Sequence, residues 1–183
     1  MSHKKSVGWC VPDSQIKIVD RESGQLLGAN QVGEVLIKSY QMTPGYLNLA
    51  KENSEAFDSQ GFIRSGDAGY YDENDLIYIM DRYKQIIKVE SVIVLPSELE
   101  YLLLTHEDVS EAAVIGVKHE FYGEVPKAFV VLKANRKVSK ESLIEYIDGL
   151  VNHYKKLRGG LTFLKELPKT PLGKINKTLL DVN

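Results

Sequence analysis

The chain has 183 residues, of which 43% are hydrophobic and 26% are charged, and its formal net charge at pH 7 is −2. A chain of this composition can bury a core, and its near-neutral charge argues against binding to nucleic acid or to an anionic membrane surface. The single cysteine, Cys10, excludes an internal disulfide and a cysteine-rich metal site.

The first part of the chain alternates short apolar runs with turn residues, which is typical of β-strands. The apolar runs lie at 16–19, 35–37 and 76–80, and turns are indicated at 20–24, 43–45 and 72–75. The last of these turns precedes a strand-like run, so it predicts a hairpin. We therefore predict a β-rich segment over residues 1–81.

Beyond residue 82 the apolar period changes to that of helices. After Pro96, the run Ser97-Glu-Leu-Glu100 reads as a capping box, and it predicts a helix over 97–105. Ser139 is the predicted cap of a second helix. The apolar face of that helix comprises Leu143, Ile147, Leu150, Val151 and Tyr154. Strands are predicted at 114–117, 128–132 and 161–164.

The order of strand, helix, two strands, helix and strand predicts a compact α+β module over residues 82–183. The predicted fold class of the whole chain is thus α+β. A β-rich segment comes first and a smaller α+β domain follows, with a connecting hinge at about residues 81–84.

Near the C-terminus, Pro168-Lys-Thr-Pro-Leu-Gly-Lys174 places a lysine after a turn that is restricted by two prolines and permitted by Gly173. An ammonium group held in this way suits a phosphate or a developing negative charge. A solvated surface turn is the alternative interpretation, and the segment alone does not distinguish the two.

Several segments, taken in order, resemble the adenylate-forming enzymes, which include acyl-CoA synthetases, 4-coumarate-CoA ligase and beetle luciferase. The resemblance extends from about Gly8 onward. The segments that carry it are Gly33-Glu-Val35, Thr43-Pro-Gly-Tyr46, Gly61-Phe-Ile-Arg-Ser-Gly-Asp67, Asp81-Arg-Tyr-Lys-Gln-Ile-Ile-Lys88, Pro96-Ser-Glu-Leu-Glu100, Lys155-Lys-Leu-Arg-Gly-Gly160 and Pro171-Leu-Gly-Lys174.

The resemblance implies an acid-thiol ligase with two half-reactions. A fatty or aryl carboxylate reacts with Mg-ATP to give an acyl-adenylate and pyrophosphate, and coenzyme A then attacks the adenylate after the C-terminal domain rotates. The implied cofactors of the complete enzyme are ATP or AMP, coenzyme A and Mg²⁺. Residues 1–81 would be the last, β-rich part of the large AMP-binding domain, and 82–183 the mobile C-terminal domain.

The resemblance also implies roles for two residues near the ribose of the nucleotide. Asp67 would accept hydrogen bonds from the ribose hydroxyls, and Arg82 would be the cation near ribose and phosphate. The residues themselves permit simpler interpretations. Asp67 could cap its own loop, and Arg82 could form a surface ion pair with Asp81 or Asp75.

Three lysines complete the implied site. Lys174 matches the lysine that bridges the substrate carboxylate and the α-phosphate during adenylation. Lys84 falls at the hinge position, and Lys88, about one helical turn onward, would face the second half-reaction. Ordinary solvent exposure is the alternative for Lys84 and Lys88.

Two departures from the family pattern bear on activity. Glu90-Ser91 stands where the family usually has lysine and glycine, which puts thioester formation in doubt. No segment matches the Ser/Thr/Gly-rich phosphate loop, so the chain alone is expected to be inactive and to need a missing N-terminal domain or a ligase partner. A non-catalytic protein that binds a nucleotide or a partner is the alternative, and light-emitting oxygenation is a third hypothesis.

Other signals bear on location and metals. No stretch approaches the roughly 20 apolar residues of a membrane span. The four histidines show no metal-ligand spacing, so no metal site is predicted. The lone cysteine fits a reducing, intracellular compartment, cytoplasmic or peroxisomal, although residues 181–183 are not a Ser-Lys-Leu peroxisomal signal.

Overall fold

The computed structural model describes residues 6–180. The chain separates into two compact units, Met1–Lys84 and Gln85–Asn183, and each unit is described by itself. Both units combine β-sheet with short helices, which confirms the predicted α+β class. Among the described residues, no helix is long and apolar enough to cross a membrane.

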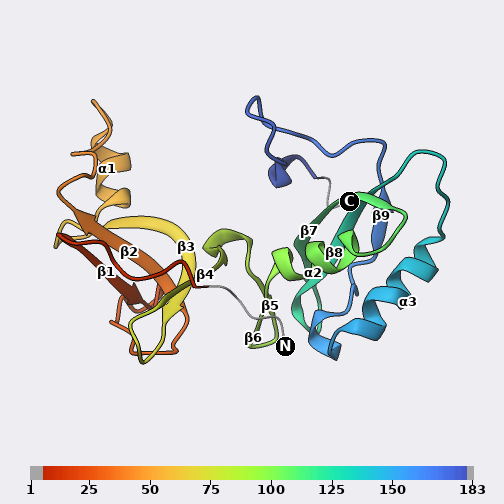
Figure 1. Cartoon of the computed structure of the whole chain (residues 1–183), viewed down its shortest axis with the longest axis horizontal. Coiled ribbons are helices and arrows are strands. Elements are labelled where there is room, and N and C mark those ends of the chain that lie inside the picture. The colour runs from red at the N-terminus through yellow and green to blue at the C-terminus, as the bar shows by residue number, and fades with distance from the viewer. Residues whose placement is uncertain (1–5, 181–183) are drawn as a thin grey trace. The chain divides into compact units, whose positions relative to one another are not determined.

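The first unit contains a sheet of four strands in the order β1-β2-β3-β4 (Figure 1). The strands span Ser14–Val19, Gly33–Ser39, Ile63–Tyr71 and Ile77–Arg82. Each strand pairs antiparallel with the next, and a short helix, α1 (Ala50–Ala56), lies between β2 and β3 in the chain. The β-rich character predicted for this part of the chain is confirmed.

A buried charge lies in the sheet of the first unit. Glu34 on β2 is only 1% exposed. A buried carboxylate is costly unless it is paired, and Arg64 on β3 places Nη1 2.8 Å from Glu34 Oε2. The Nε atom of Arg21 lies 4.0 Å from the same oxygen. The Glu34 carboxylate therefore brings together two arginines from separate segments, Arg21 and Arg64.

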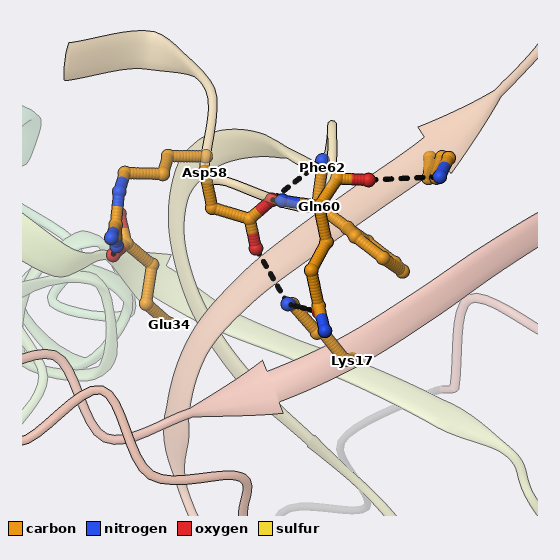
Figure 2. A network of polar contacts seen from close by, with 7 residues as sticks. Lys17, Glu34, Asp58, Gln60 and Phe62 are labelled. Carbon is orange, nitrogen blue, oxygen red and sulfur yellow. Dashed lines mark hydrogen bonds and ion pairs between the residues drawn. The ribbon is translucent and has the colours of Figure 1, made fainter. Parts of the chain in front are cut away.

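Asp58 organises the connection between α1 and β3 (Figure 2). Its Oδ1 accepts the backbone N–H groups of Gln60 and Phe62, each at 2.9 Å, and its Oδ2 lies 2.5 Å from Lys17 Nζ. Burial alone would raise the pKa of Asp58. The hydrogen bonds from Lys17, Phe62 and Gln60 and the positive charge of Lys17 outweigh burial and lower that pKa below its usual value.

The lowered pKa of Asp58 predicts that the first unit loses stability in acid. Because the folded pKa lies below the unfolded one, this stabilisation is full above about pH 4–5 and is lost as the pH falls further. Asp58→Asn should lower the free energy of unfolding by about 1 kcal/mol at pH 7. It should also reduce the loss of stability between neutral pH and pH 3.

Denaturant unfolding followed by the fluorescence of Trp9, the only tryptophan of the chain, reports on the first unit, which contains it. Asp72 also has a lowered pKa, because hydrogen bonds from Leu76, Asn74 and Tyr78 outweigh burial, so some pH dependence should remain in the variant. An acid-induced loss as steep in Asp58→Asn as in the native chain would contradict the assignment.

The second unit contains the other sheet, in which β8 is central (Figure 1). Its strands are β5 (Ile87–Val89), β6 (Val92–Val94), β7 (Val109–His119), β8 (Gly123–Leu132) and β9 (Leu161–Phe163). The order is β6-β5-β8-β7, and β9 pairs in parallel with β8. Two α-helices, α2 (Pro96–Leu104) and α3 (Lys140–Leu150), belong to the same unit.

The alternation of side chains along β7 and β8 gives the second sheet two apolar faces. One face belongs to a core cluster that includes residues of both helices. Its members include Leu99, Leu103, Val114, Val130, Leu143 and Ile147. The other face is covered by the C-terminal segment, since Leu167 and Leu180 cluster with Ala113 and Phe129. The segment that carries Lys174 is therefore packed against the sheet through Leu167 and Leu180.

Three details differ from the sequence-based expectations. The predicted capping box is wrong, because Leu95 is the N-cap of α2 and its side chain makes no capping bond. The predicted apolar face of the second helix extends too far, because Leu150, the last residue of α3, is 53% exposed, and Val151 and Tyr154 lie beyond the helix. Lys88 lies on strand β5, so helical spacing does not describe its position. The predicted cap of α3 is confirmed, since Ser139 Oγ accepts the N–H of Ser142.

Candidate functional site

The antiparallel pairing of β3 and β4 brings Asp67 and Arg82 together. The two residues are direct partners in the register, and Arg82 Nε lies 3.3 Å from Asp67 Oδ1. The side chain of Arg82 is 62% exposed and that of Asp67 is 32% exposed. Because this pair of opposite charges is open to solvent, both groups are accessible to a ligand. An ion pair of this kind contributes little to stability.

The local contacts show what holds these two side chains in place. It is the hydroxyl of Ser65 that accepts the backbone N–H of Asp67, at 3.0 Å. Arg82 Nη1 donates to the carbonyl oxygen of Ser65 at 3.1 Å, and its guanidinium pairs with Asp67. The Asp67–Arg82 pair is therefore held by the contacts of Ser65 on β3 and by the strand register.

The backbone beside this pair is closely packed. A register shift between Ala68 and Gly69 interrupts the β3–β4 ladder one residue after Asp67. A Cβ atom at Gly69 would lie 2.5 Å from the carbonyl oxygen of Tyr78 and 2.9 Å from Val35 Cγ2. No side chain fits there without a shift of the backbone, so glycine at this position allows β4 to approach Asp67.

Lys84 is the last residue of the first unit and lies in the 3₁₀ turn Tyr83–Gln85. The residue before it is held, because the guanidinium of Arg21 lies 5.0 Å from the centroid of the Tyr83 ring. Lys84 itself is exposed. The division between the units therefore falls one residue after Tyr83, which is packed in the first unit.

Lys88 lies at a surface hollow of the second unit. The hollow has a volume of about 710 Å³. It is lined by Ile86, Lys88, Glu90, Lys118, His119, Glu120, Gly123 and Glu124. The backbone N–H of Lys88 donates to Glu124 Oε2 at 2.9 Å, which fixes β5 against β8. The lining of the hollow thus includes both cationic and anionic side chains.

The departure at residues 90 and 91 has a structural counterpart. Glu90 lies in the turn between β5 and β6 with φ of 55°, a conformation that favours glycine. Its N–H donates to the carbonyl oxygen of Tyr122 at 2.8 Å. The strained position is thus Glu90, whereas the sequence comparison with the family pattern placed the usual glycine at Ser91.

Lys174 follows a tight, hydrogen-bonded turn. The N–H of Thr170 donates to the carbonyl oxygen of Lys174 at 2.7 Å, and the N–H of Gly173 donates to that of Thr170 at 2.8 Å. Gly173 has φ of 79°, so this position favours glycine. Lys174 is exposed, and within residues 6–180 the structure shows no hydrogen bond or ion pair of its ammonium group.

The predicted site residues thus form two groups. Asp67 and Arg82 lie together in the first unit, and Lys88 and Lys174 lie in the second. Within the described part of the chain, no three His, Cys, Asp or Glu side chains group together as a metal site would require.

Sequence reasoning missed the residues that support these groups, among them Ser65, Glu100, Glu124 and Lys177. Their roles depend on contacts between elements that are distant in the sequence. Ser65 touches Arg82 because of the β3–β4 register, and Glu124 touches Lys88 because β5 joins β8. No local pattern signals either contact.

The comparisons with known proteins match both units. The model of the AMP-binding enzyme C-terminal domain matches residues 98–174, and that of the AMP-binding enzyme matches residues 1–47. Among curated proteins, a probable 4-coumarate-CoA ligase 2 of Dictyostelium discoideum is 39% identical over 97% of this chain and 32% of its own length. A luciferin 4-monooxygenase of Photinus pyralis is 37% identical over 93% of this chain and 31% of its own length.

A solved structure also matches this chain. The O-succinylbenzoate coenzyme A synthetase of Bacillus subtilis, in complex with AMP, has a TM-score of 0.83 and 30% identity. The match covers 96% of this chain and 35% of that one. The chain spans about a third of the length of the curated relatives it matches.

These matches and the fold define the class: the chain belongs to the adenylate-forming, or AMP-binding, enzyme superfamily. Within the superfamily it is similar to the 4-coumarate-CoA ligases and to the luciferases.

Proposed function

We propose that the chain supplies the C-terminal third of an ATP-dependent ligase that joins a fatty or aryl carboxylate to coenzyme A. The observation that carries the proposal is the solvent-open pair of Asp67 and Arg82, 3.3 Å apart on adjacent strands. A carboxylate beside a guanidinium matches the groups of a nucleotide, in which two ribose hydroxyls lie close to a phosphate.

In this proposal Asp67 and Arg82 hold the nucleotide. The two oxygens of the Asp67 carboxylate accept hydrogen bonds from the ribose hydroxyls, and the Arg82 guanidinium binds the neighbouring phosphate. Because Arg82 is also tied to the Ser65 carbonyl, its position does not depend on Asp67 alone. Both groups therefore remain in place before the nucleotide arrives.

Lys174 acts in the first half-reaction. Its ammonium group stabilises the negative charge that develops as the substrate carboxylate attacks the α-phosphate and pyrophosphate leaves. The tight turn at Thr170–Gly173 presents the amine without competition from a neighbouring side chain within the described residues. We infer a domain boundary at about 81–84, with Lys84 as the hinge residue between 1–81 and 82–183.

Lys88 and the hollow beside it act in the second half-reaction, in which the coenzyme A thiol attacks the adenylate. Lys88 and Lys118 supply positive charge for an anionic acceptor. Glu90 adds negative charge at the same place. Its effect should be to make thioester formation slower than adenylation. The relative rates of the two half-reactions measure this effect.

The isolated chain is proposed to be inactive. It contains no segment like the phosphate loop of the family, and the described residues hold no cluster of metal ligands. ATP phosphates and Mg²⁺ would be bound by a further N-terminal region or by a partner that carries it. Mg²⁺, when bound, would neutralise charge on the phosphates.

A fusion protein tests the proposal. In it, this chain is joined to the part of the Dictyostelium relative that the chain does not match, which is about two thirds of that protein. This fusion protein should catalyse carboxylate-dependent exchange of pyrophosphate into ATP, measured over a panel of fatty and aryl acids. The isolated chain and the truncated relative serve as controls and should show no exchange. Adenylation by the isolated chain at an enzyme-like rate, or a folded fusion protein inactive with every acid, would contradict the proposal.

A non-catalytic binding protein is the second candidate. Large apolar side chains are exposed in the first unit, among them Leu26, Tyr40 and Leu47 at 71%, 74% and 88%. Such side chains are typical of surfaces that a partner covers. An NMR titration of the isolated chain with AMP and coenzyme A separates the candidates. Saturable shifts around Asp67 and Arg82 without activity in the fusion protein favour the binding role.

A further inference from the structure

The turn that carries Lys174 has an ion pair at each end. On its N-terminal side, Lys169 Nζ lies 2.9 Å from Glu111 Oε1. On its C-terminal side, Lys177 Nζ lies 2.7 Å from Glu100 Oε1. The side chains of the second pair are only 14% and 19% exposed, against 44% and 32% for the first. The C-terminal tie is therefore less screened by water and salt.

Glu100 is itself fixed by the backbone of the sheet. Its Oε1 atom accepts the N–H of Val114 at 2.7 Å as well as the ammonium of Lys177. Val114 is fully buried on β7, and Glu100 belongs to α2. A hydrogen bond to an ionised acceptor is stronger than a neutral one, so the carboxylate is a rigid attachment point.

The apolar contacts of the segment leave the turn itself uncovered. Leu167 and Leu180 bury the two ends of the segment against Ala113 and Phe129, and the partly buried Ile175, directly after Lys174, packs against the same cluster. The turn between them is exposed from residue 171 to residue 174. Apolar packing and the hydrogen bond from the Asn176 N–H to the Pro168 carbonyl oxygen, at 2.7 Å, hold the base of the turn. The ion pair three residues after Lys174 adds a charged contact at the point where the chain leaves the turn.

We propose that Glu100 is a positioning residue for Lys174 and that it acts through Lys177. The inference rests on the proposed function, in which the Lys174 ammonium must reach a defined point in the transition state. A displacement of about 1 Å can reduce the rate of an enzyme by about 100-fold. The Glu100–Lys177 pair prevents such a displacement.

Amide hydrogen exchange in the full 183-residue chain tests the physical part of the proposal. Lys177→Met removes the charge and leaves the Glu100–Val114 bond intact. It should accelerate exchange at the Thr170 and Gly173 amides by about tenfold, since both amides depend on the closed turn. Lys177→Arg retains the pair and should restore exchange to within about twofold of the native rate.

The other end of the turn supplies a matched control. Lys169→Met removes the more exposed pair and should change exchange at Thr170 and Gly173 by less than about threefold. Glu100→Gln should match Lys177→Met, and the double variant should add nothing, because both changes break one interaction. Equal effects of Lys169→Met and Lys177→Met, or no effect of Lys177→Met, would overturn the proposal.

The fusion protein separates this inference from the proposed function. Lys177→Met should lower kcat for adenylation by about 10- to 100-fold and leave KM for ATP within about twofold. Lys177→Arg should recover most of the rate. If Lys174→Ala is fully active, the proposed function of Lys174 fails. If Lys174→Ala is inactive while Lys177→Met is fully active, only the positioning role fails.

Discussion

Lys174→Ala in the fusion protein should lower kcat for adenylation by about 100- to 1,000-fold, the effect expected when one preorganised group that stabilises developing charge is removed. The ammonium group is exposed and makes no ion pair within the described residues, so its removal breaks no structural interaction there. The measurement is pyrophosphate exchange with saturating ATP and acid.

Two controls show whether the loss belongs to the transition state. Lys174→Ala should unfold at the same denaturant concentration as the native chain, and its KM for ATP should stay within about threefold. Asp67→Asn, in contrast, should mainly raise KM for ATP, because its proposed contacts are already made with bound nucleotide. A rise in KM without a fall in kcat for Lys174→Ala would place Lys174 in ground-state binding and contradict its proposed role.

Gly69→Ala should destabilise the first unit strongly, with a loss of about 1–3 kcal/mol in the free energy of unfolding. The added Cβ would lie 2.5 Å from a backbone carbonyl oxygen, that of Tyr78, which cannot move without displacing β4. Since β4 carries Arg82 at its end, nucleotide binding should weaken in the same variant. Denaturant unfolding followed by Trp9 fluorescence measures the loss.

Gly28→Ala is the matched control for this prediction. The nearest atom to a Cβ at Gly28 is Gln31 Oε1 at 3.6 Å, an ordinary contact with a side chain. This variant should change stability by less than about 0.5 kcal/mol. If Gly69→Ala unfolds at the same denaturant concentration as Gly28→Ala, the close approach of β4 at Gly69 does not constrain the sheet.

Much of the fold could be predicted because local signals agreed with it. Turn residues between short apolar runs indicated the β-rich first unit, and Ser139 marked the start of α3. The start of α2 was misjudged because Ser97 and Glu100 fit a capping pattern, but Pro96 occupies the first turn and makes Leu95 the cap. Leu150 fits the apolar period of α3, yet the helix ends there and leaves its side chain exposed.

The candidate site could be predicted only in part. The resemblance to a family pointed to Asp67, Arg82 and Lys174, and the glycine before Lys174 explained its presentation. The contact between Asp67 and Arg82 could not be derived, because it depends on the register of β3 and β4 and on an irregularity at Ala68 and Gly69. The capping pattern predicts a helix-cap role for Glu100, whereas its carboxylate binds Val114 and Lys177.

The hydrogen bond from Val114 to Glu100 has a consequence for solubility. Strand β7 lies at the edge of its sheet, and an open edge can pair with a strand of another molecule and start aggregation. At the middle of β7 the outward N–H of Val114 is already taken by a carboxylate from α2. A strand approaching from outside would find this donor already occupied, so intermolecular pairing is disfavoured at the middle of β7.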